Sequence, residues 1–174
     1  MCRDRDDCGP TPARSWWDAC IGVTFGFVPR LPRYCLPPVG FFHVTSRGVG
    51  RMNIAWDDFD RIRWCRLADK TIHRYDWACY AYCLMNNHFH LVIEATLDRL
   101  SRGMWHLNGR YAERFNSRYE RTGHVFEARF AARLIEEESH FEAAARYVLD
   151  NPVRAHLCDC PEDWPWSGGI LASR

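Results

Sequence analysis

The pattern of apolar positions along the chain predicts four β-strands. Residues 41–46 are rich in aromatic and β-branched side chains and precede two glycines, which is typical of a strand that ends in a turn. Residues 77–84 and 88–94 predict the two strands of a hairpin, because the Asn-Asn pair between them favours a turn. A fourth strand is expected over residues 128–134.

Helical patterns separate and follow these strands. Two aspartates at the start of residues 57–73 supply cap chemistry for a first helix. Apolar side chains recur every three or four positions over residues 100–115, which predicts an amphipathic helix ending near Gly123. Acidic residues at 136–138 begin a last helix. We expect this helix to stop by Asn151, because the next residue is proline.

The order of these elements predicts the fold class. Strand–helix–strand occurs twice, with the hairpin between the two units, which indicates an α+β protein with a ferredoxin-like, split β-α-β antiparallel sheet. Its helices would cover one face, and the last helix is an addition to that pattern. We expect residues 34–174 to form this domain. The Pro-rich residues 1–33 would be a poorly ordered N-terminal extension.

Composition limits the possible functions. With 47% hydrophobic and 26% charged residues, the 174-residue chain can bury a core. No apolar run reaches the roughly 20 residues of a membrane span, so we expect a soluble, cytoplasmic protein without a membrane partner. A net charge of +1 does not indicate nucleic acid, so a DNA site would need local clustering of arginines. Nine irregularly spaced cysteines favour neither a disulfide framework nor a zinc site.

The sharpest local feature is the pair His88 and His90. Alternation along the predicted strand sends both side chains to one face, about 7 Å apart. Two imidazoles in that arrangement can converge on a single metal ion. Two half-exposed histidines beside a turn would have the same spacing.

A second candidate is the pair Tyr147 and Asn151, which lie one turn apart on one face of the last helix. A tyrosine hydroxyl with a pKa of about 10 is a poor nucleophile. A divalent cation would help by polarising the phosphate under attack, and a carboxamide oxygen could complete its ligands. A packed tyrosine and a helix-ending asparagine would look the same, but with the histidines they make a coherent site. That site would give the additional helix a catalytic purpose.

Seven segments, in one order, carry a family resemblance. They are 42–48 (FHVTSRG), 81–85 (AYCLM), 87–91 (NHFHL), 115–119 (FNxRY), 123–126 (GHVF), 146–147 (RY) and 151–155 (NPVRA). On these segments the chain resembles the single-tyrosine HUH transposases, and most closely the REP-associated tyrosine transposases. The resemblance covers about residues 29–167 and includes a closing motif at 164–167 (WPWS).

This resemblance implies an enzyme that cleaves and rejoins single-stranded, hairpin-flanked DNA through a 5′-phosphotyrosine intermediate. Tyr147 would be the nucleophile, and His88, His90 and Asn151 would hold Mg²⁺ or Mn²⁺. It further implies that the protein acts as a monomer or a homodimer. It also suggests that translation truly begins at position 28, which would place residues 1–27 upstream of the start; recovery of their peptides would refute this expectation.

Four arginines are candidate DNA contacts. Arg110, Arg114 and Arg118 are spaced by four along the long helix and could follow phosphates, although any solvated helix face in an arginine-rich chain has this pattern. Arg47 belongs to a matched segment, but the glycine-containing loop after it departs from the polar residues of the family. The turn before the histidines departs as well, with Asn86 in place of proline; asparagine suits a turn.

Two other functions stay open on the sequence. One is a catalytically inactive protein of the same fold that binds DNA hairpins. The other is an RNA-recognition-like module that stacks bases on its sheet, which would need aromatic side chains where a central strand carries histidines here. The presence together of both histidines, the tyrosine and the asparagine favours the enzyme.

Overall fold

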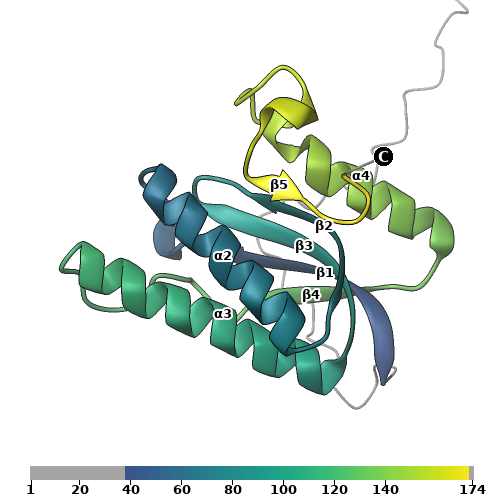
Figure 1. Ribbon diagram of the computed structural model, residues 1–174, viewed down its shortest axis with the longest axis horizontal. Coiled ribbons are helices and arrows are strands. Elements are labelled where there is room, and N and C mark those ends of the chain that lie inside the picture. Colours follow the sequence, from purple (N-terminus) through teal and green to yellow (C-terminus); the bar gives the residue numbers. More distant parts are fainter. Residues whose placement is uncertain (1–37, 173–174) are drawn as a thin grey trace, which may run out of the picture. The chain divides into compact units, whose positions relative to one another are not determined.

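The computed structural model describes residues 38–172, which form a five-stranded antiparallel sheet with three long helices (Figure 1). The elements are β1 (Val39–Arg47), η2 (Val49–Arg51), α2 (Asp58–Arg74), β2 (Ala78–Leu84), β3 (His88–Thr96), α3 (Leu97–Arg118), β4 (Ala131–Ile135), α4 (Glu138–Arg154), η3 (Pro161–Asp163) and β5 (Ser167–Gly168). The expectations for residues 1–33, including a start at position 28, lie outside the described residues.

The strand order is β4-β1-β3-β2-β5. Each β-α-β unit is therefore split by a strand of the other, since β3 lies between β1 and β2, and β1 lies between β3 and β4. This confirms the ferredoxin-like sheet expected from the sequence. The short β5 extends the sheet beyond β2 and was not expected.

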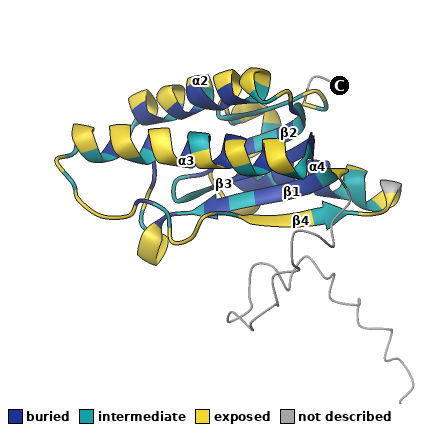
Figure 2. Cartoon of the chain, turned by 90° about the horizontal axis from the view of Figure 1, so that it is seen from below, coloured by how far each residue is buried: buried dark blue, intermediate teal, exposed yellow. Residues whose placement is uncertain are grey.

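The alternation of side chains gives the two faces of the sheet different partners. Figure 2 shows α2 and α3 lying along the same side of the sheet, with their exposed residues outward. Phe89 of β3 points to that side, where its ring centroid is 4.8 Å from that of Trp64 on α2. The side chains on the other face of the sheet, including His90, point towards α4, since Tyr147 of α4 packs against the His90 ring.

Helix α4 ends later than expected. The prediction that it stops by Asn151 was wrong, because α4 continues through Pro152 to Arg154. Proline has no N–H, so it removes only one backbone hydrogen bond this close to the end of the helix. The last turn still closes, because the Ala155 N–H donates to the Asn151 carbonyl at 3.0 Å. Asn151 is therefore held in regular helix, one turn after Tyr147.

The other boundary differences are smaller. Helix α3 ends at Arg118 instead of near Gly123, and Glu120 just beyond it has a positive φ of 51°. Strand β4 covers Ala131–Ile135, three residues later than the start expected from the apolar pattern. The helix after Asp57 has the expected cap, since the Asp57 side chain accepts a hydrogen bond from the Asp60 N–H.

Candidate functional site

Small side chains bring α4 close to the sheet. Ala144, Ala145 and Val148 are buried, and α4 lies mainly across β2 and also contacts β3. Since alanine adds little volume between the helix and the strands, the neighbouring Tyr147 is held against the centre of the sheet rather than above it. The Tyr147 side chain is buried there as well.

The two predicted histidines and the predicted tyrosine meet within one chain. The ring centroids of His88 and His90 are 4.9 Å apart, and that of Tyr147 is 6.0 Å from His90. A third imidazole joins them from β1, since His43 lies 5.1 Å from His90 and 6.2 Å from Tyr147 between ring centroids. Nothing in the sequence analysis gave His43 a role.

All three imidazoles are uncharged at neutral pH, because their pKa values are lowered. Burial, with a smaller effect of the Arg133 charge, lowers the pKa of His43 to about 4. Burial and Arg47 likewise lower the pKa of His88 to about 4, and burial holds that of His90 well below its usual range. A neutral imidazole keeps a nitrogen lone pair, which is the form that binds a metal ion.

In both candidate metal ligands, His88 and His90, Nδ1 is the ring nitrogen that already has a hydrogen-bond partner. His88 Nδ1 is 2.6 Å from the side-chain oxygen of Asn87, and His90 Nδ1 is 2.9 Å from Nε2 of His43. The nitrogen of each ring left for another ligand is therefore Nε2.

Asn151 lies one turn beyond Tyr147 and is buried. Its side-chain nitrogen donates to the Tyr147 backbone carbonyl at 2.9 Å, so the carboxamide oxygen is the atom that can serve as a ligand. Among residues 38–172, no three His, Cys, Asp or Glu side chains are grouped to hold a metal ion. Two imidazoles and one carboxamide oxygen would fit a divalent cation, and the two nitrogen donors suit Mn²⁺ better than Mg²⁺.

Positive charge surrounds this site. The Arg154 guanidinium carbon lies 5.2 Å from the ring centroid of Tyr147. Arg133 of β4 is the cross-strand partner of His43, and Arg47 is that of His88. Neither Arg133 nor Arg154 was expected from the sequence, because cross-strand register and contacts between the helix and the sheet determine where they lie. Arg133 is exposed, so this side of the site is open to solvent.

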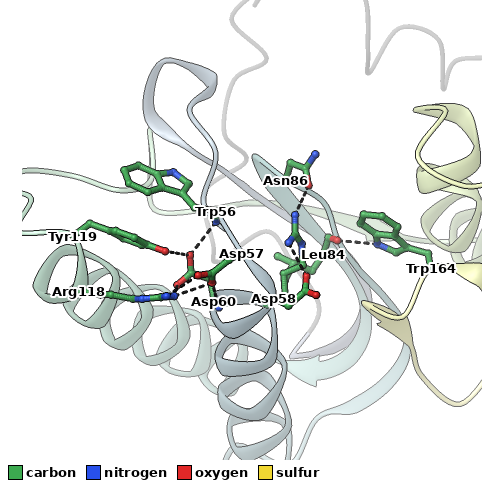
Figure 3. A network of polar contacts seen from close by, with 10 residues as sticks. Trp56, Asp57, Asp58, Asp60, Leu84, Asn86, Arg118, Tyr119 and Trp164 are labelled. Carbon is green, nitrogen blue, oxygen red and sulfur yellow. Dashed lines mark hydrogen bonds and ion pairs between the residues drawn. The ribbon is translucent and has the colours of Figure 1, made fainter.

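The predicted DNA-contacting arginines of α3 have different partners. Arg118 donates to both Asp57 and Asp60, each at 2.6 Å, and holds the ends of α2 and α3 together (Figure 3). Arg110 pairs with Glu113 at 3.0 Å on the surface. Within the described chain, no hydrogen bond or ion pair engages the side chain of Arg114 or of Arg47. A role in DNA binding stays a prediction for all four.

Asn86, which replaces the proline of the resembled family, is part of the framework. Its side-chain oxygen accepts a hydrogen bond from Arg61 of α2 at 2.8 Å (Figure 3). Its backbone carbonyl accepts from the N–H of Ile54, also at 2.8 Å. The substitution therefore attaches the turn before His88 to α2.

No helix among residues 38–172 is long and apolar enough to cross a membrane. Cys79 and Cys83 of β2 are buried and pack as small apolar side chains.

Comparisons with known proteins agree with this fold. A search of curated proteins finds no match. A solved structure of a REP-associated tyrosine transposase bound to a REP hairpin is similar, with a TM-score of 0.59 and 17% identity, covering 74% of this chain and 75% of that one. A Deinococcus radiodurans structure assigned to the transposases gives a TM-score of 0.47 and 15% identity, covering 67% and 92%, which is too weak to add to the argument. The family model "Transposase IS200 like" matches residues 42–151, most of the described domain. The chain therefore belongs to the IS200-like transposase family.

Proposed function

We propose that this transposase cleaves and rejoins single-stranded DNA next to a hairpin, with Tyr147 as the nucleophile. The observation that carries the proposal is the contact of the Tyr147 ring with His90, 6.0 Å between ring centroids, inside one chain. The phenol of Tyr147, the two imidazoles and the carboxamide of Asn151 thus lie on the same side of one sheet. No second subunit is required to bring them together.

The bonds that form and break in the covalent step belong to the phenol and the phosphodiester. The Tyr147 oxygen attacks phosphorus, an O–P bond forms, and the bond from phosphorus to the 3′ oxygen breaks. The products are a 5′-phosphotyrosine link and a 3′-hydroxyl, which takes up through solvent the proton that the phenol loses. Attack of a 3′-hydroxyl on the link reverses the step and rejoins DNA without ATP, since the number of phosphoester bonds is conserved.

His88, His90 and Asn151 would hold the cation, Mg²⁺ or Mn²⁺. When bound, such an ion polarises the phosphate and stabilises the charge that develops during attack. The neutral imidazoles, each with Nδ1 already hydrogen-bonded, and the carboxamide of Asn151, whose nitrogen is the atom that bonds the Tyr147 carbonyl, support this assignment. With the ion in place, these three side chains would hold the phosphate next to Tyr147.

The charges around the site support DNA as the substrate. Arg47 and Arg133 would meet phosphates beside the histidines, and Arg154 would counter negative charge at the phenol. Arg114 of α3 would contribute a more distant contact. A DNA hairpin is the partner we propose, because the similar transposase of known structure was solved with a REP hairpin bound.

The experiment is incubation of the full chain with labelled single-stranded hairpin DNA and Mn²⁺, followed by denaturing electrophoresis. We expect a covalent protein–DNA band that requires the metal and is lost in Tyr147→Phe. Tyr80→Phe is the matched control, because it removes a phenol hydroxyl that bonds Glu94 instead of lying near His90. DNA binding without any covalent band would refute the proposal and would indicate the catalytically inactive hairpin-binding protein.

A further inference from the structure

The contact between His43 and His90 constrains where the protons of the site lie. The two nitrogens are 2.9 Å apart, and the rings are stacked with an angle of 21° between their planes. Both side chains are buried. At this distance one nitrogen must carry the proton and the other must accept it.

The direction of this hydrogen bond follows from the use of His90 as a ligand. Its Nδ1 is engaged with His43 in either direction, so only Nε2 remains for a cation. Nε2 of a neutral imidazole has a lone pair only when the proton is on Nδ1. His90 must then be the donor and His43 the acceptor.

His88 shows the same arrangement with a different partner. Asn87 donates through its side-chain nitrogen to the Arg51 carbonyl at 3.2 Å, which leaves its oxygen to meet His88 Nδ1 at 2.6 Å. An amide oxygen can only accept, so the proton of His88 is on Nδ1 and its lone pair is on Nε2. The two candidate ligands are thus prepared in the same tautomer by two different residues.

We infer that His43 is a positioning residue for His90, accepting a hydrogen bond from Nδ1 and thereby fixing the tautomer and ring orientation that leave Nε2 for a divalent cation. The inference rests on the proposed function. Residues that hold the second nitrogen of a metal-binding histidine in this way raise metal affinity, and their loss costs about 10- to 100-fold.

The tautomer can be measured without any metal. In nitrogen-15 NMR spectra of the metal-free protein, we expect His90 to carry its proton on Nδ1 and to lose this preference in His43→Phe. The His90 signals are assigned by their absence from His90→Gln. A His90 ring protonated on Nε2 in the unmodified protein would overturn the inference, and this result needs no variant of His43 to fold.

Metal affinity is the second measurement, with Mn²⁺ alone as the probe in calorimetric titrations. His43→Phe should weaken Mn²⁺ binding about 10- to 100-fold, and His43→Gln, whose oxygen can accept from Nδ1, should recover most of it. Phe41→Leu is the control on the same strand and the same face, since Phe41 packs against Tyr80 and Phe141 instead. It should lower the melting temperature without changing affinity.

The outcomes separate this inference from the proposed function. Unchanged Mn²⁺ affinity in a folded His43→Phe variant overturns the role of His43 alone. An unmodified protein that binds Mn²⁺ no better than His88→Ala overturns the metal site of the proposed function, while the NMR measurement still decides the tautomer.

Discussion

Replacing Asp60 with alanine should lower the free energy of unfolding by about 2–4 kcal/mol. The Asp60 side chain is 5% exposed and accepts three hydrogen bonds (Figure 3). They come from the Trp56 backbone N–H at 2.9 Å, the Tyr119 hydroxyl at 2.7 Å and the Arg118 guanidinium at 2.6 Å. This carboxylate therefore joins the start of α2 to the end of α3.

The magnitude follows from what each donor loses. A hydrogen bond to a charged acceptor contributes roughly 1.5–3 kcal/mol. The donors of Trp56 and Tyr119 lose their acceptor, but Arg118 keeps Asp57 and is 34% exposed, so its share is small because of solvent screening. Two bonds, less what water regains in the vacated space, give the range above.

Urea unfolding followed by tryptophan fluorescence measures this change. Asp58→Ala is the matched control, since its side chain is 75% exposed, pairs only with Arg61 among the described residues, and should cost less than about 1 kcal/mol. If Asp60→Ala were no more destabilising than Asp58→Ala, the cluster would not anchor the helices, and the argument that Arg118 has a structural role would fail.

Three further predictions test the DNA contacts, the composition of the site and the acid stability. Arg114→Ala should reduce the slope of log affinity for hairpin DNA against log salt by about 1, and an unchanged slope in fluorescence anisotropy would exclude a phosphate contact. A mixture of Tyr147→Phe and His88→Ala should form no covalent DNA adduct, because one chain supplies both groups; an adduct would indicate exchange between subunits. The hydrogen bond from Arg118 is the main cause that lowers the pKa of Asp57 to about 2, below its usual 3.8. The stability it adds is present above about pH 4 and is lost as the pH falls towards 2. Thermal unfolding of Asp57→Asn should therefore vary less between these pH values than that of the unmodified protein.

Much of the fold was predictable because its signals are local. The period of the apolar residues in α3 and the aspartate cap of α2 are properties of neighbouring positions in the sequence. Strand β5 had no such signal, since two residues, Ser167–Gly168, show no period. They pair with β2 because the Trp164 indole donates to the Leu84 carbonyl and fixes the chain beside that strand.

The site was predictable only in part. Strand alternation places His88 and His90 on one face. Their proximity to Tyr147 was expected because the two motifs make a coherent site together and because of the family resemblance, not from any local pattern. The contact between His43 and His90 joins residues 47 positions apart and depends on cross-strand register, which the sequence does not display. The pairing of Arg118 with Asp57 spans 61 positions and was missed for the same reason.

The residue that becomes linked to DNA can be identified directly. The full chain is incubated with a hairpin-flanked single strand and Mn²⁺, the adduct is digested, and the linked peptide is sequenced by mass spectrometry. We expect a single nucleotide-bearing peptide, with the phosphate on the phenol oxygen of Tyr147. A phosphate on any other side chain, or no linked peptide although the protein binds both DNA and Mn²⁺, would contradict it.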